Sequence, residues 1–217
     1  MKILAVNGSP RKKWNTAILL NKALEGAESQ GAETALIHLY DLNFKGCTSC
    51  FACKMKDGNS FGRCAVRDEL TPILRNIEEA DGIILGSPVY FGTASAEMRA
   101  FMERLLYPYV VYEAIPSVHI KKRINTGFIY TMGATESQMT ELGYEQHFKF
   151  NEMFMEHIFG SSETLVVTDT YQFDDYSKYV ATLFDADEKA RRRKEVFPND
   201  CKKAFEMGAR IAKQSNI

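Results

Sequence analysis

The start of the chain decides the fold. It reads Ile3-Leu4-Ala5-Val6-Asn7-Gly8-Ser9-Pro10-Arg11, and a helical pattern begins soon after, at Asn15-Thr16. Four apolar residues predict a short buried strand, and the chain then turns sharply at Asn7-Gly8 toward the helix. Where a strand ends in such a loop, unpaired backbone N–H groups and the positive end of the helix meet at one point. This arrangement suits a phosphate group.

The side chains of this loop support the same interpretation. Ser9, Asn15 and Thr16 offer hydroxyl and amide groups for hydrogen bonds, and Arg11 adds a positive charge. The loop has neither the Gly-Lys-Ser/Thr of a Walker A sequence nor a G-x-G-x-x-G fingerprint. It therefore predicts a site for a monophosphate, and the alternative is an ordinary strand-to-helix turn.

Length and composition limit the possible classes. The chain has 217 residues, 45% of them apolar, which predicts a single domain over residues 1–217. With 27 basic and 28 acidic residues the net charge is −1, so we expect neither a nucleic acid nor a membrane as partner. The basic run at residues 191–194 is interpreted as a solvated helix face. The absence of a long apolar run or a signal-peptide pattern leads us to expect a cytoplasmic protein.

Strand-like and helix-like patterns alternate along the chain. Strands are predicted over residues 2–6, 34–39, 82–86, 124–130 and 164–168. Helices are predicted over residues 17–30, 68–80, 95–106, 146–159 and 199–213. This alternation indicates an α/β fold with a doubly wound, five-stranded parallel sheet. The flavodoxin-like strand order 2-1-3-4-5 fits it, with a ligand where the first and third strands end.

Two connections are longer than this fold requires. They cover residues 107–123 and 171–187, and such connections are typical of lids or subunit contacts. The first contains three tyrosines together with Val110, Val111 and Ile115. We expect it to pack against another subunit, which makes the protein a homodimer or homotetramer.

The loop after the third strand complements the phosphate loop. It contains Pro88, which stiffens the backbone, Tyr90 and Phe91, which offer flat apolar surface, and Gly92, which permits a tight turn. By the topology it lies beside the loop at residues 9–16. Flat apolar side chains next to a monophosphate site favour FMN as the ligand. The alternative is that Tyr90 and Phe91 are core residues at the end of a strand.

Two segments carry a resemblance to a known family. Residues 7–11 (NGSPR) with Asn15-Thr16, and residues 80–92 (ADGIILGSPVYFG), resemble the NADPH-dependent FMN reductase and iron–sulfur flavoprotein group of flavodoxin-like proteins. The resemblance implies that four residues hold the FMN phosphate: Ser9, Arg11, Asn15 and Thr16. It implies that five residues line the isoalloxazine ring: Pro88, Val89, Tyr90, Phe91 and Gly92. A third flavin loop, matched less closely, comprises Thr131, Met132 and Gly133. Trp14 lies within the phosphate loop and receives no role.

Four of the five cysteines form a second group. Cys47, Cys50, Cys53 and Cys64 are spaced C-x2-C-x2-C-x10-C, and thiolates at such intervals can converge on one cluster. Iron–sulfur members of the family carry a similar compact motif for a [4Fe–4S] cluster, but the last gap is longer here. Zinc is a further alternative, although the motif is crowded for a tetrahedral site. We favour free or redox-active thiols over a cluster, and we interpret Cys201 as a core residue.

These patterns lead to one functional interpretation. We expect an oxidoreductase that passes hydride or electrons from NAD(P)H through bound FMN to a small-molecule or electron-carrier acceptor. No catalytic acid or base is assigned, because the flavin supplies the chemistry. The four histidines show no metal spacing and are interpreted as ordinary residues. The alternatives are an iron–sulfur flavoprotein that carries electrons and a binding module without flavin.

Overall fold

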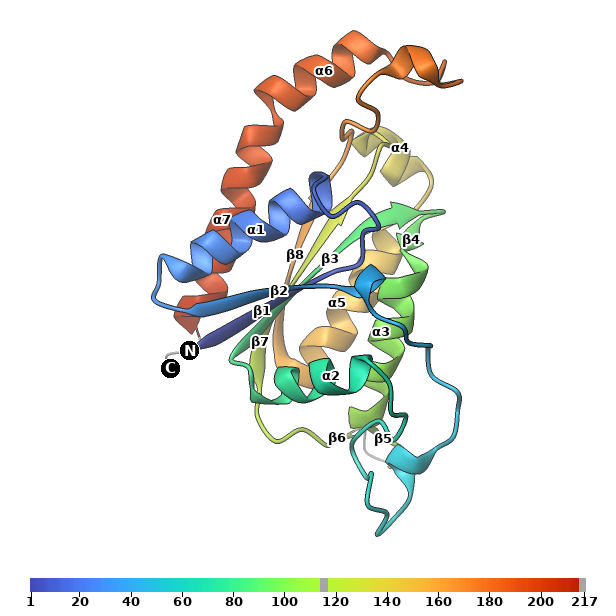
Figure 1. Ribbon diagram of the computed structural model, residues 1–217, viewed down its shortest axis with the longest axis vertical. Coiled ribbons are helices and arrows are strands. Elements are labelled where there is room, and N and C mark those ends of the chain that lie inside the picture. Colours follow the sequence, from blue (N-terminus) through green and yellow to red (C-terminus); the bar gives the residue numbers. More distant parts are fainter. Residues whose placement is uncertain (114–116, 215–217) are drawn as a thin grey trace.

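Five parallel strands form the centre of the molecule (Figure 1). The computed structural model describes residues 1–113 and 117–214. The strands are β1 (Lys2–Asn7), β2 (Glu33–His38), β3 (Gly82–Tyr90), β7 (Ile124–Thr131) and β8 (Gly160–Val167). Their order is β2-β1-β3-β7-β8, with parallel pairing throughout. The predicted order 2-1-3-4-5 is therefore confirmed.

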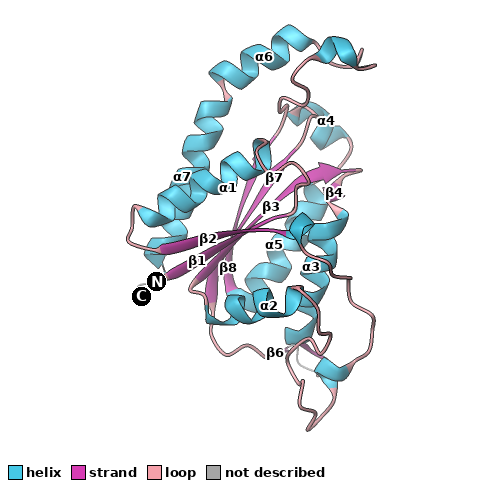
Figure 2. Cartoon of the chain, in the orientation of Figure 1, coloured by secondary structure: helices cyan, strands magenta, loops and turns pink. Residues whose placement is uncertain are grey.

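Helices cover both faces of this sheet (Figure 2). One face carries α1 (Asn15–Glu28) and α7 (Phe197–Gln214), and the other carries α2 (Leu70–Glu79), α3 (Ala96–Leu106) and α5 (Glu145–Phe159). Two further helices, α4 (Glu136–Glu141) and α6 (Ala186–Glu195), lie outside the predicted helix ranges, although the basic run of α6 was interpreted as a helix face. Both begin with an N-cap side chain, from Thr135 and Asp185 respectively. None of the helices in the described ranges combines the length and apolarity of a membrane span.

Short elements complete the fold. Four 3₁₀ turns are η1 (Leu39–Asp41), η2 (Ala52–Lys54), η3 (Tyr107–Tyr109) and η4 (Tyr176–Lys178). Strands β5 (Val110–Val111) and β6 (Ser117–Val118) pair with each other, apart from the main sheet. Strand β4 (Thr93–Ala94) adds to the main sheet by antiparallel pairing with the end of β3. As a result β3 continues to Tyr90, four residues beyond the predicted strand end at Gly86.

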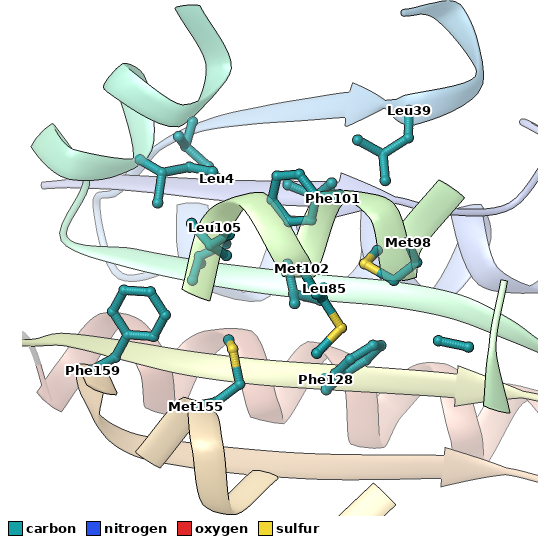
Figure 3. Close-up of a cluster of buried hydrophobic side chains, with 14 of the residues drawn as sticks. Leu4, Leu39, Leu85, Met98, Phe101, Met102, Leu105, Phe128, Met155 and Phe159 are labelled. Atoms are coloured by element: carbon teal, nitrogen blue, oxygen red, sulfur yellow. The ribbon is translucent and has the colours of Figure 1, made fainter. Parts of the chain in front are cut away.

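The two cores follow from the alternation of side chains along the strands. Leu4 and Leu85 lie in the core shared with α2, α3 and α5, whereas Ile3 and Ile84 lie in the core shared with α1 and α7. Figure 3 shows part of the first core, where Phe101 of α3 lies near Leu4 and Leu85. Strands buried on both faces read as continuous apolar runs, and this explains the sequence pattern of β1 and β3.

Helices α1 and α7 approach each other closely. A Cβ placed on Gly208 would lie 1.8 Å from the carbonyl oxygen of Ala23, and one on Gly26 would lie 1.9 Å from that of Phe205. Both obstacles are backbone atoms, so only glycine permits this contact between the two helices. The last helix also begins two residues earlier than predicted, with Pro198 in its first turn, where no intrahelical N–H bond is lost.

The close contact leads to a prediction for Gly208→Ala. Overpacking costs about 1–3 kcal/mol or more, whereas the better helix propensity of alanine returns about 1 kcal/mol. Because the obstacle is backbone, we expect the free energy of unfolding to fall by about 2 kcal/mol in a urea titration. Lys203→Ala, on the exposed side of the same helix, should change it by less than about 0.5 kcal/mol. Equal stability of the two variants would contradict the prediction.

Candidate functional site

The loop after β1 is held by its neighbours in a sharp turn. The N–H of Gly8 donates to the carbonyl of Gly86 at 2.8 Å, and the hydroxyl of Ser95 donates to the carbonyl of Gly8 at 2.6 Å. A Cβ on Gly8 would lie 2.7 Å from the Cβ of Met98, so no larger residue fits there. Within the loop, the N–H of Arg11 donates to the hydroxyl of Ser9 at 3.1 Å. These contacts direct the chain from the sheet into α1.

Helix α1 begins without a side-chain cap. Trp14 occupies the N-cap position and accepts no bond with its side chain, and the first turn contains no acidic residue. The first N–H groups of a helix have no intrahelical partner, and they carry the positive end of the helix dipole. Asn15 and Thr16 lie there with buried side chains, and the hydroxyl of Thr16 is 2.8 Å from that of Thr131. The start of α1 is thus suited to bind an anion.

A cleft of about 400 Å³ lies at the carboxyl ends of the strands, beside this helix start. It is lined by most of the residues predicted for the cofactor: Ser9, Arg11, Asn15, Thr16, Pro88, Val89, Tyr90, Thr131, Met132 and Gly133. Phe91 and Gly92 do not line it. They form the tight turn between β3 and β4, with φ of 50° and 81°, and the side chain of Phe91 points fully into solvent.

Other lining residues were missed by the sequence reasoning. Gln138, Leu142 and Tyr144 come from α4 and the turn that follows it. A larger set comes from the long connection after β8: Thr170, Tyr171, Gln172, Leu183 and Phe184. The only signal for that set was the length and aromatic content of the connection. No local pattern indicated which of its residues lie at the cleft.

The side chain of Trp14 links the loop after β1 to the long connection after β8. Its indole Nε1 donates to the carbonyl of Tyr171 at 3.0 Å, and the guanidinium of Arg11 lies over its ring at 3.9 Å from the centroid. Arg11 also donates to the carbonyl of Gln172 at 2.6 Å. The side chain that the sequence left without a role therefore helps to orient the positive charge at the mouth of the cleft.

The basic run of α6 also contacts the cleft. Arg191 is exposed, as predicted, but the interpretation as a solvated face is wrong for Arg192 and Arg193. Arg193 donates to Oδ1 of Asn15 at 2.8 Å, and Arg192 donates to Asp200 at 2.8 Å. Burial lowers the pKa of Arg193. The prediction failed because it considered charge along the chain, whereas folding places α6 against the start of α1.

Lys189, on the same helix, contacts the loop after β7, which also lines the cleft. Its ammonium group is almost fully buried, donates to the carbonyl of Gly133 at 2.7 Å and pairs with Asp169. Helix α6 thus contacts two of the residues that line the cleft: Asn15 through Arg193, and Gly133 through Lys189. Neither contact was predicted.

The four clustered cysteines line one small pocket. Cys47 and Cys50 are exposed, Cys64 is half-buried, and burial raises the pKa of the Cys53 thiol. The ten residues between Cys53 and Cys64 turn back on themselves, and the N–H of Gly62 donates to the carbonyl of Cys53 at 3.0 Å. This loop and α4 lie at opposite ends of the molecule (Figure 1). The cysteine pocket and the cleft are therefore separate.

A buried guanidinium holds the ends of the cysteine loop together. Arg104 of α3 donates to the carbonyl of Lys45 at 3.1 Å, to that of Val66 at 3.2 Å and to the thiol of Cys64 at 3.3 Å. Its counterion is Asp68, which it contacts with both terminal nitrogens. Burial would raise the pKa of Asp68, but the hydrogen bonds and charge of Arg104 lower it below its ordinary value.

The cysteine pocket is narrow. Its volume is only about 20 Å³. Among residues 1–113 and 117–214, no three His, Cys, Asp or Glu side chains are arranged to hold a metal ion. The thiols thus line one pocket, but in this conformation of the described residues they are not arranged as a metal site.

The first aromatic connection is partly outside the described residues. Ile115, one of the residues on which the expected subunit contact rests, lies in the range that is not described. Tyr112 is largely exposed and its hydroxyl donates to that of Tyr107 at 2.8 Å. Packing of this connection against another subunit stays a prediction.

Comparison with known proteins identifies related sequences. The family described as NADPH-dependent FMN reductase matches residues 1–160. An iron–sulfur flavoprotein of Methanocaldococcus jannaschii is 42% identical over 104 residues, which is 48% of this chain and 51% of that protein. One of Archaeoglobus fulgidus is 38% identical over 109 residues, which is 50% of this chain and 47% of that protein. The chain spans about half the length of the curated relatives it matches.

Solved structures share the fold over nearly the whole chain. An NAD(P)H:quinone oxidoreductase from Methanothermobacter marburgensis has a TM-score of 0.70 at 15% identity and covers 96% of this chain, with 98% of its own chain covered. An azoreductase from Bacillus anthracis has a TM-score of 0.68 at 15% identity, covering 96% of this chain and 99% of its own. At this identity the likeness concerns the fold alone.

The Arg104–Asp68 pair leads to a pH-dependent prediction for Asp68→Asn. The variant leaves a buried cation without its counterion, so we expect a loss of about 3 kcal/mol in the free energy of unfolding near neutral pH. Because the folded-state pKa of Asp68 is lowered, its stabilisation is present above the ordinary carboxyl pKa of about 4 and is lost below it.

Urea titrations of both proteins across this range provide the test. The difference between wild type and Asp68→Asn should be constant from about pH 5 to 8 and shrink below about pH 4. Asp174→Asn, at an exposed position, is the matched control and should leave stability unchanged. A difference that does not vary with pH would contradict the role of the ionised carboxylate.

Proposed function

Because this chain belongs to the NADPH-dependent FMN reductase family, we propose that its cleft binds FMN and that the protein is an NAD(P)H-dependent oxidoreductase. One observation carries the proposal. The uncapped start of α1 lies in the same cleft as the loops that follow β3 and β7. This is the position between β1 and β3 at which the strand order of the sheet reverses. In doubly wound sheets this is where ligands bind.

The phosphate of FMN fits the end of the cleft at α1. The donors there are the first N–H groups of the helix and the side chains of Ser9, Asn15 and Thr16. Arg11 supplies a positive charge, and Arg193 holds the amide oxygen of Asn15 so that the amide keeps one orientation. The other hydrogen bond of this amide goes from Nδ2 to the carbonyl of Tyr171 at 2.8 Å.

The flat ring fits the remainder of the cleft. Pro88, Val89 and Tyr90 form one wall, and Thr131, Met132 and Gly133 form another. Bound FMN would supply the hydride and single-electron chemistry. The residues of this chain bind and orient the ring and exclude water from it, and Lys189 restrains the loop at Gly133 through its carbonyl.

The acceptor is proposed to reach the ring beneath the long connection after β8. Tyr171, Leu183 and Phe184 face the cleft, and Phe173 stacks on Tyr179 at 4.1 Å between ring centroids. Such a surface suits a flat, apolar small molecule.

A second candidate function is that of an iron–sulfur flavoprotein. Two observations favour it: all four clustered cysteines line one pocket, and the curated relatives named above are iron–sulfur flavoproteins. The thiol set suits a [4Fe–4S] cluster, but the loop would have to rearrange to bind one, because no three of these side chains are arranged to hold a metal ion among the described residues. Free thiols remain the other possibility.

The phosphate site is tested with Arg11→Ala. Loss of a hydrogen bond to a charged group should weaken FMN binding by about 1.5–3 kcal/mol, without loss of the fold. Titration of FMN fluorescence gives the affinity. Lys12→Ala is the matched control, because it removes an equal charge from a neighbouring residue that pairs with Asp41 instead. Equal affinity of all three proteins would remove Arg11 from the site, and a wild type that binds no FMN would refute the proposed function.

The cysteines are tested by anaerobic purification and reconstitution with iron and sulfide. A cluster requires close to four irons per chain, because each iron takes one protein ligand, and Cys64→Ser should lose them. Cys201→Ser, on α7, is the matched control and should retain them. If the cysteines are free, wild type and both variants will bind no iron, and a thiol assay will find the unmodified thiols.

A further inference from the structure

A second cavity lies at the amino-terminal ends of the strands, whereas the cleft lies at their carboxyl ends. Its volume is about 240 Å³, and no residue lines both cavities. Its floor is apolar, formed by Ile77 of α2, Ile124 at the start of β7 and Phe159 at the end of α5. Phe61, from the loop between Cys53 and Cys64, forms a wall. The cavity thus has space and apolar surface for a small organic molecule.

A buried tyrosine supplies a polar group inside this cavity. Tyr109 lines it with 9% of its surface exposed, and its hydroxyl has no hydrogen-bond partner in the described part of the chain. Its ring packs edge-on against Phe159, with centroids 5.9 Å apart. Burial raises the pKa of Tyr109 to about 12, so the hydroxyl keeps its proton at neutral pH. Solvent still reaches this hydroxyl, so a ligand atom in the cavity can replace water as its hydrogen-bond partner.

The mouth of the cavity is positively charged. Arg63 is neutralised by Glu78, with contacts of 3.1 and 2.5 Å, and Lys122 is neutralised by Asp81. Lys121, which also lines the cavity, has no ion-pair partner among residues 1–113 and 117–214. One lysine is therefore left to attract an anionic group at the entrance, while the floor is apolar.

From this arrangement we propose that the cavity is a binding site for a small aromatic carboxylate that carries a second polar group. The carboxylate lies at Lys121, the ring lies on the apolar floor, and the second polar group forms a hydrogen bond with the Tyr109 hydroxyl. The site is independent of the flavin cleft. Its wall belongs to the cysteine loop, because Gly62 lines the cavity and bonds to Cys53.

The test uses three related probes and the chain of residues 1–217, measured with and without added FMN. 4-Hydroxybenzoate has both polar groups, benzoate lacks the hydroxyl and 4-hydroxybenzyl alcohol lacks the carboxylate. Isothermal titration calorimetry gives their affinities. We expect 4-hydroxybenzoate to bind about five- to tenfold more tightly than either of the other two, which is the effect of one net polar interaction.

Two substitutions identify the site. Tyr109→Phe should make 4-hydroxybenzoate and benzoate bind equally, and Lys121→Gln should make 4-hydroxybenzoate and the alcohol bind equally. Lys202→Gln, an exposed lysine of α7, is the control and should change nothing. Lys121 is exposed, so its variant will fold even if the Tyr109 variant does not. No saturable binding of 4-hydroxybenzoate, or binding that both substitutions leave unchanged, would overturn the proposal.

Discussion

The parallel pairing of β1 with β3 is the constraint on which the cleft depends. The chain leaves β1 toward α1 on one face of the sheet and leaves β3 toward α3 on the other, so the two loops separate at the carboxyl ends of the strands. Ser95 holds the loop after β1 close to β3. Its hydroxyl donates to Gly8 while its N–H donates to the hydroxyl of Ser87 at 2.9 Å. The start of α1 and the end of β3 are thereby held at one opening, with helical N–H groups facing it.

Arg104 has a comparable role at the other end of the molecule. Its guanidinium is fully buried, a costly position that is tolerated because Asp68 neutralises it, and two carbonyls and the Cys64 sulfur accept its remaining N–H groups. These partners lie before and after the cysteine loop, so one side chain of α3 closes the loop at its base. Lys54 adds a second attachment through the carbonyls of Tyr107, Pro108 and Val110. The loop is therefore part of the packed structure, although it has little regular secondary structure of its own.

The part of the chain beyond the family match contributes to the cleft. The match ends at residue 160, and the later residues include the long connection after β8 (residues 171–187), α6 and α7. Two cations of α6, Lys189 and Arg193, reach loops that belong to the matched part. Helix α7 directly follows α6 in the chain and packs closely on α1 at Gly26 and Gly208. This contact fixes the position of α6 relative to the start of α1. The C-terminal segment thus holds two loops that line the cleft and also supplies part of its lining.

The sequence by itself determined the sheet and the loop after β1, which forms part of the cleft. Apolar runs without alternation marked β1 and β3, and a turn with small polar residues marked the phosphate loop, because these signals lie within a few neighbouring residues. It did not determine what only long-range packing decides. Arg193 meets Asn15 across 178 positions, Trp14 meets Tyr171 across 157, and Phe91 turns outward because β4 pairs back onto β3. The convergence of the cysteines also depended on Arg104, which lies 40 residues from Cys64 and on another helix. Contacts of this kind leave no local pattern, since each partner alone reads as an ordinary surface or core residue.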